Sequence, residues 1–168
     1  MYQQHDITVR RARVRDADRI AAFVNQHRRN EHKISEQSVI ARFGTVGFLL
    51  AERGDDLVGL LGWQAENLVV RVTDFLVWPA AERLTVGQAL LSEMERTAHE
   101  LQCEVVLLFL PSQRSPHLAE FCEAFGYAPK IVSNLTKAWQ EAAHDARFGD
   151  DETVLMKPLR SDRVLRPI

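Results

Sequence analysis

The sequence contains few cysteines, no long apolar segment and no surplus of charge of one sign. Cys103 and Cys122 are the only cysteines in 168 residues, which argues against a disulfide-rich secreted scaffold. No apolar run approaches the roughly 20 residues that span a bilayer, and the opening "MYQQHDITVRRARVRD" lacks an apolar signal segment. We therefore expect a cytoplasmic protein that does not cross a membrane.

The charge balance and the missing motifs exclude further classes of function. Lys and Arg number 21 against 23 Asp and Glu, so there is no basic excess to neutralise a nucleic-acid backbone, and no nucleic-acid partner is expected. The six histidines show no metal-ligand spacing, and "HELQC" (99–103) lacks the second histidine of a zinc-protease helix, so no metal site is expected. No Gly-x-Ser-x-Gly sequence is present, which leaves hydrolase chemistry without support.

Length and apolar content predict a single domain over residues 1–168, with a core of ordinary size. Hydrophobic periodicity predicts strand, helix, helix and a meander of three strands in the first half. These elements are expected at 6–14, 16–26, 34–44, 47–52, 57–65 and 67–78. A helix at 86–101 then links the last of these strands to a buried strand at 103–110, and such a crossover makes the two strands parallel.

The last part of the chain is predicted to contain a helix at 115–126 and two closing strands, 127–134 and 152–159. Residues 135–149 between those strands have helical spacing, with an apolar stripe at Leu135, Ala138, Trp139, Ala142 and Ala146. This inserted helix can pack on its own domain, form a lid, or make a homodimer contact. Residues 159–168 are expected to be a C-terminal tail that lies on the surface or across a partner.

The order of these elements, together with "VWPAAERLTVGQALL" (77–91), resembles the GNAT acetyltransferase superfamily over nearly the whole chain. The family joins Val-x-Pro to an acyl-CoA loop of the pattern Arg or Gln, two residues, Gly, any residue, Gly or Ala. Gly87 matches that pattern, whereas Glu82 and Thr85 occupy the other two signature positions. The resemblance implies an α/β fold in which a mixed sheet of about seven strands is flanked by four helices, with the extra helix inserted between the last two strands.

The resemblance also implies a cofactor site at the start of the helix that follows this loop. Backbone N–H groups at a helix N-terminus bind pyrophosphate, because the positive end of the helix dipole lies there. We expect the N–H groups of Val86, Gly87 and Gln88 to point at the anion, while Thr85 adds bulk and Glu82 adds negative charge. The cofactor-binding segment implied is Arg83, Leu84, Thr85, Val86, Gly87 and Gln88, with acetyl-CoA as the co-substrate.

Asp74 is the only acid in the strand that precedes the loop, and the family often places its general base late in that strand. An ionisable group among apolar neighbours is a candidate for proton transfer, and the alternative is a structural hydrogen-bond acceptor. The resemblance implies that the backbone of Phe75, Leu76 and Val77 pairs with the pantetheine arm of the cofactor.

Cys122 occupies the place where the family often has a tyrosine that protonates the leaving thiolate, and Pro116 replaces the usual asparagine. A thiol can donate a proton, so Cys122 is a candidate acid. The alternative interpretation is a small buried residue on a packed helix.

Together these features predict an acyl-CoA-dependent N-acyltransferase that transfers an acetyl group to an amine of a small molecule or peptide. The alternative is a GNAT-like binding or regulatory domain that has lost catalysis, because several signature positions differ.

Overall fold

The computed structural model describes residues 6–28, 32–109 and 121–160. Its strands form one seven-stranded sheet in the order β1-β2-β3-β4-β5-β7-β6, which confirms the predicted mixed α/β sheet. The chain divides into two compact units, one of Met1–Gln64 with Asp74–Met94 and one of Ala65–Thr73 with Glu95–Ile168. The prediction of a single domain stays a prediction.

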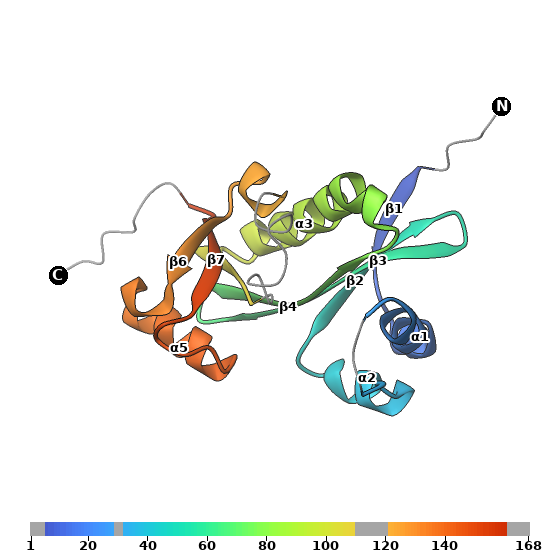
Figure 1. Ribbon diagram of the computed structural model, residues 1–168, viewed down its shortest axis with the longest axis horizontal. Helices are drawn as coiled ribbons and strands as arrows, with labels where there is room; N and C mark the ends of the chain where they lie inside the picture. Colours follow the sequence, from blue (N-terminus) through green and yellow to red (C-terminus); the bar gives the residue numbers. More distant parts are fainter. Residues whose placement is uncertain (1–5, 29–31, 110–120, 161–168) are drawn as a thin grey trace. The chain divides into compact units, whose positions relative to one another are not determined.

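The first unit contains the helices and strands of the N-terminal half. They are β1 (Ile7–Arg11), α1 (Ala17–His27), α2 (Glu36–Arg42), β2 (Gly47–Arg53), β3 (Asp56–Glu66), and the end of β4 (Val69–Val77). β2 pairs with β3 antiparallel, as the predicted meander requires, and β3 lies next to β4 in the sheet. β1 pairs antiparallel with β2, a pairing that the sequence had not assigned. Figure 1 shows α1 and α2 together beside β1, β2 and β3.

The core of this unit lies between α1, α2 and one face of β2 and β3. Apolar side chains from both layers meet there, among them Ile20, Phe23 and Val39 from the helices and Phe48, Leu50 and Leu60 from the strands. Ser35 caps α2 by accepting a hydrogen bond from the Ser38 backbone N–H, and serine is one of the residues favoured at this position.

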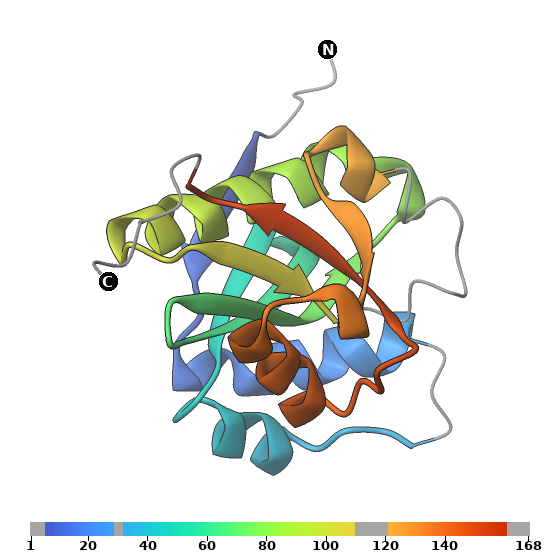
Figure 2. The same ribbon diagram turned by 90° about the vertical axis from the view of Figure 1, so that its left-hand side faces the viewer.

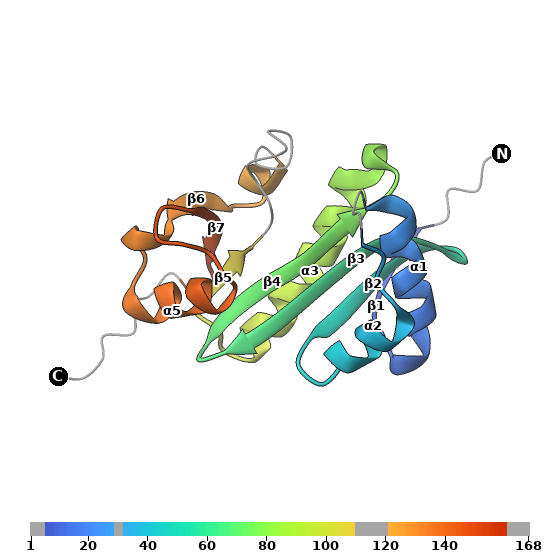
Figure 3. The same cartoon turned by 60° about the horizontal axis from the view of Figure 1, so that its bottom comes forward.

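Helix α3 (Arg83–Glu100) covers the opposite face of the first unit's strands (Figure 3). It approaches β3 closely at Gly59, where an added Cβ would lie 2.6 Å from Val86 Cγ1 and 2.9 Å from Leu90 Cδ1. The glycine is therefore required at this position by packing, because any side chain would push the helix away from the strand.

The second unit contains β5 (Val105–Leu108), β6 (Ala128–Ile131), α5 (Lys137–Asp145) and β7 (Thr153–Pro158), together with the start of β4. β4 and β5 are parallel, which confirms the crossover prediction. β7 pairs antiparallel with both β5 and β6, so the last strand lies between them (Figure 2). Pro129 is in β6 at the sheet edge, where a missing N–H is tolerated.

The inserted helix is present but shorter than the predicted 135–149. A 3-10 turn at Val132–Asn134 precedes it, and Leu135 lies outside α5 with its side chain buried. Trp139, Ala142 and Ala146 pack against a core cluster made by β4, β5 and β7. The stripe thus packs on its own part of the chain, one of the three arrangements considered, except at Ala138, which is exposed. Ala143, which the predicted stripe omits, is the buried residue of α5.

The predicted helix 115–126 and the predicted C-terminal tail are only partly within the described ranges. Of the predicted helix 115–126, residues 121–124 are helical, and residues 110–120, Pro116 included, lie outside the described ranges. The tail beyond Arg160 lies outside them as well.

Among the described residues, no helix combines the length and apolar character that a membrane span needs, and no group of His, Cys, Asp or Glu is arranged to hold a metal ion.

Candidate active site

Strand β4 presents its side chains alternately to its two faces as it approaches the start of α3. Leu76 packs against the core cluster that α1 and α2 supply, so Asp74, two residues earlier, lies on the same face. Phe75 and Val77 belong to the other face. The three residues expected to pair with the pantetheine arm therefore sit in regular strand geometry.

Asp74 forms a two-point ion pair with Arg42, the last residue of α2. Arg42 Nη1 donates to Asp74 Oδ1 at 3.0 Å, and Nη2 donates to Oδ2 at 2.5 Å. The Asp74 side chain is 13% exposed and the Arg42 side chain 40%, so the pair lies at the edge of the core. This geometry fixes the plane of the carboxylate, because both of its oxygens are held.

Gly62 on β3 provides the space that the Asp74 carboxylate occupies. A Cβ added at position 62 would lie 2.6 Å from Asp74 Oδ2 and 3.1 Å from its Cγ. No side chain fits there without moving the carboxylate. The sequence thus places a glycine and an arginine around the one acid of β4.

Arg42 is itself held in place by its surroundings. Its guanidinium carbon lies 5.2 Å from the centre of the Phe48 ring, a cation-π distance, and its backbone carbonyl accepts a hydrogen bond from the Val46 N–H at 2.8 Å. These contacts help to hold Arg42 in position beside Asp74.

The loop that precedes α3 differs from the prediction in where the helix starts. A 3-10 turn, Ala80–Glu82, runs directly into α3 at Arg83, whereas the predicted helix began at Val86. The N–H groups of Glu82 and Arg83 bond to the carbonyls of Pro79 and Ala80. The segment is helical earlier than expected because the 3-10 turn supplies its first hydrogen bonds.

This earlier start moves the expected anion donors toward the beginning of the helix. In a regular α-helix the N–H groups beyond the first turn bond to carbonyls four residues earlier, which uses those of Val86, Gly87 and Gln88. The first-turn N–H groups that follow the two bonded to Pro79 and Ala80 are those of Leu84 and Thr85. Both of these residues are exposed, whereas Val86 and Gly87 are buried.

Glu82 forms an ion pair with Arg53 at the end of β2. The Arg53 Nη2 to Glu82 Oε2 distance is 2.6 Å, and the two side chains are 28% and 31% exposed. The carboxylate that replaces the family's Arg or Gln thus has a cationic partner, which reduces its repulsion of an incoming anion.

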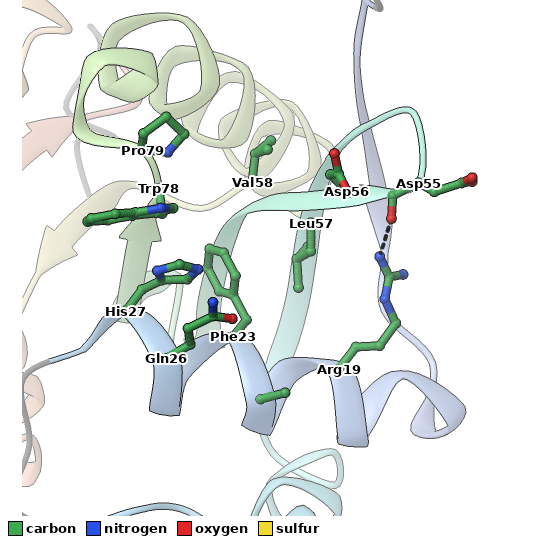
Figure 4. A pocket seen from close by; sticks show the side chains of 11 residues that line it. Arg19, Phe23, Gln26, His27, Asp55, Asp56, Leu57, Val58, Trp78 and Pro79 are labelled. Carbon is green, nitrogen blue, oxygen red and sulfur yellow. Dashed lines mark hydrogen bonds between the residues drawn. The ribbon is translucent and has the colours of Figure 1, made fainter.

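A pocket of about 540 Å³ lies beside this segment in the first unit, between α1, the turn from β2 to β3, and Trp78 (Figure 4). Trp78 stacks on His27 with ring centres 4.7 Å apart, and His27 meets Phe23 edge-on at 4.9 Å. Arg19 at the other end of the pocket donates to the Asp55 carbonyl. Aromatic faces and polar groups therefore share one hollow next to the start of α3.

Cys122, the candidate acid, lies in the second unit and is buried, with 1% of its surface exposed. Burial raises the pKa of its thiol to about 11, so the thiol stays protonated at neutral pH. Its backbone carbonyl accepts hydrogen bonds from the Phe125 and Tyr127 N–H groups. This burial favours the alternative interpretation, a small packed residue, and its role as an acid stays a prediction.

The buried side chains around Cys122 were not singled out from the sequence. Tyr127 is 1% exposed, and burial, followed by the negative charge of Glu95, raises its pKa well above the usual range. Lys157 pairs with Glu95 and lies over the Tyr127 ring. These side chains form a polar cluster within the second unit.

Arg42 and Gly62 are the residues of the first unit that the sequence reasoning missed. Arg42 appears in the sequence only as a basic residue in the last turn of a helix, which is common because it complements the helix dipole. Gly62 appears only as a glycine inside a strand, a pattern that indicates a close approach without saying of what. Only the fold brings the two to Asp74.

The family model described as "Acetyltransferase (GNAT) family" matches residues 12–127 of the chain. The chain therefore belongs to the GNAT acetyltransferase family. This match confirms the resemblance to the GNAT superfamily that the sequence predicted.

Solved structures with the same fold come from several organisms. The PaiA N-acetyltransferase of Thermoplasma acidophilum, in complex with coenzyme A, is 14% identical, with a TM-score of 0.69 over 91% of this chain and 99% of that one. A GNAT-family acetyltransferase of Staphylococcus aureus Mu50 is 16% identical, with a TM-score of 0.70 over 92% and 100%. YncA, a putative acetyltransferase of Salmonella typhimurium with its cofactor acetyl-CoA, is 18% identical, with a TM-score of 0.64 over 96% and 98%. No curated protein matches the chain.

Proposed function

We propose that the protein transfers an acetyl group from acetyl-CoA to a primary amine of a small molecule or peptide. The observation that carries this proposal is the arrangement along one segment of the first unit: an oriented carboxylate on β4 is followed directly by the N-terminus of α3. A base and an anion site on consecutive elements are what transfer from a pyrophosphate-bearing thioester requires. Family membership and the cofactors of the similar structures support the same chemistry.

In this proposal the cofactor pyrophosphate lies at the start of α3, within the segment Arg83–Gln88. The Leu84 and Thr85 N–H groups donate to it, and the Arg83 guanidinium adds positive charge. The backbone of Phe75, Leu76 and Val77 pairs with the pantetheine arm and places the thioester carbonyl near β4.

The chemical step needs one base and one proton donor. The amine nitrogen attacks the thioester carbonyl carbon, the C–N bond forms, the C–S bond breaks, and Asp74 takes the amine proton. The departing thiolate takes a proton from water or from Cys122, and the burial of the Cys122 thiol favours water.

The test is calorimetric titration with acetyl-CoA, followed by thiol release with glycinamide and putrescine as amine probes. We expect saturable binding, and with at least one probe a release rate above the rate without protein. Asp74→Asn should bind acetyl-CoA as wild type does but turn over about 100-fold more slowly, the usual size of a general-base contribution. Cys122→Ala should turn over at the wild-type rate if water is the proton donor.

A second candidate is a GNAT-like domain that binds a ligand without catalysis. The features that favour it are the buried Cys122 and the Glu82 and Thr85 departures from the acyl-CoA loop. Acetyl-CoA binding without thiol release from any probe would favour this candidate. Absence of both binding and release would remove the proposed function altogether.

A further inference from the structure

We propose that Arg42 is a positioning residue that holds the Asp74 carboxylate in one orientation for proton removal, in the space that Gly62 leaves open. This inference rests on the proposed function and adds a role for α2, a helix that does not itself carry the candidate base. Its observations come from the first unit alone.

The first observation is that Arg42 engages both oxygens of the same carboxylate. With Nη1 on Oδ1 and Nη2 on Oδ2, rotation of the carboxylate about its Cβ–Cγ bond would break at least one hydrogen bond. The ion pair with Arg42 therefore restricts the orientation of the Asp74 carboxylate.

The second observation is that Gly62 and Arg42 constrain the carboxylate from different elements. The Asp74 Oδ2 atom that accepts from Arg42 Nη2 is the one that would lie 2.6 Å from a Cβ at position 62. Real Cβ atoms essentially never come that close. A side chain at position 62 would force Asp74 away from Arg42, so the two positions act on the same atom.

The third observation is the accessibility of the pair. The Asp74 side chain is 13% exposed, so it is largely but not completely buried. A catalytic group gains from a fixed orientation, since misplacing it by about 1 Å can lower the rate about 100-fold. A pair that served stability alone would affect melting but not the chemical step.

The experiment compares Arg42→Met, Arg42→Lys and Gly62→Ala with wild type, using acetyl-CoA and the acceptor probes glycinamide, putrescine and water. Arg42→Met should lower kcat about 10–100-fold, while the calorimetric Kd for acetyl-CoA changes less than about twofold. Arg42→Lys should recover part of the loss, since an ammonium supplies charge but not the two-point fork. Arg96→Met, which removes an exposed arginine of α3, is the matched control and should leave kcat unchanged.

Double variants separate positioning from a structural role. If Arg42 and Gly62 act through Asp74, then adding Arg42→Met to Asp74→Asn should lower kcat no further. Melting temperatures identify a variant that loses activity by unfolding, and Arg42→Lys then decides the question because it changes the fewest contacts.

Wild-type kcat in Arg42→Met, a further loss when it is added to Asp74→Asn, or a parallel rise in the acetyl-CoA Kd would overturn the inference. A wild-type protein that does not bind acetyl-CoA, or that binds it but releases no thiol with any of the three probes, would instead overturn the proposed function and the inference with it. Failure of the inference alone requires an active wild-type protein, so the two failures are distinguishable.

Discussion

Ion pairs in the first unit bring together acidic and basic side chains that are far apart in the sequence. Arg53 and Glu82 are 29 residues apart, yet they pair beside the segment expected to hold pyrophosphate. The net effect of Glu82 on an anion is therefore that of a partly neutralised charge. This changes the size of the effect expected from removing it.

Replacing Glu82 with glutamine should tighten acetyl-CoA binding a few-fold. The variant removes a negative charge near the pyrophosphate and releases the Arg53 guanidinium from that carboxylate, so that it can face the anion. Calorimetry at low and high salt measures this, and the gain should shrink at high salt because exposed charges are screened. Glu36→Gln, an exposed change on α2, is the control. Weaker binding in Glu82→Gln would mean that the ion pair organises the loop instead of repelling the ligand.

Asp16 illustrates a residue whose charge serves stability. It accepts two hydrogen bonds from the Arg10 guanidinium, at 2.8 and 3.0 Å, and one from the Arg13 backbone N–H at 2.8 Å. The Arg10 hydrogen bonds lower the pKa of Asp16 from 3.8 to about 2, against the opposing effect of burial. The folded protein thus stabilises the charged form of the Asp16 carboxylate relative to the unfolded chain.

The free energy of unfolding should therefore contain about 2 kcal/mol from Asp16 that depends on pH. Because the folded pKa lies below the unfolded one, this contribution is complete above about pH 5 and is lost as the pH falls from there toward 2. Urea unfolding of wild type and Asp16→Asn should differ at pH 7 and converge near pH 2, with the exposed Asp18→Asn as control. A constant difference at all pH values would show that Asp16 acts through packing alone.

At the scale of elements, the contact between α3 and β3 holds the helix whose start is the proposed anion site. Gly59 lets Val86 and Leu90 of the helix lie directly on the strand. The N-terminal half of α3, with the Leu84 and Thr85 N–H groups, is thereby held against the meander.

Gly59→Ala should destabilise the protein by about 1–3 kcal/mol, because its methyl group overlaps packed side chains. It should also weaken acetyl-CoA binding in the folded protein, since the start of α3 shifts. Gly44→Ala is the matched control, because a Cβ at position 44 meets no atom within 4 Å. Thermal melting and calorimetry on both variants provide the comparison. Equal stability of Gly59→Ala and Gly44→Ala would show that the helix moves freely away from β3.

The order of elements was predictable because their hydrophobic periods are long and regular. The alternation in "DITVRRARV" and the buried run "CEVVLLFL" gave two strands, and the crossover between 67–78 and 103–110 gave their parallel pairing. The ends of helices were less predictable. α3 starts three residues early because a 3-10 turn precedes it, and α5 starts two residues late because Leu135 is buried outside the helix.

The parts of the candidate site that lie close together in the sequence were predictable, and the parts contributed by distant segments were not. Asp74 and the start of α3 are close in sequence, and a family pattern marks both. Arg42 and Asp74 are 32 residues apart, and their meeting depends on how α2 is placed over β4, which no local pattern encodes. The location of Cys122 in the core likewise depended on how its helix packs, and helical spacing alone was compatible with either face.

For the whole molecule, the central claim is that Asp74, on the strand leading into α3, removes the amine proton during transfer from acetyl-CoA. The most direct measurement is the rate of thiol release by wild type and Asp74→Asn at saturating acetyl-CoA, with glycinamide or putrescine as the acceptor. The account predicts that both proteins bind acetyl-CoA with similar Kd and that the variant is about 100-fold slower. Equal rates for the two proteins, both above the rate without protein, would contradict it.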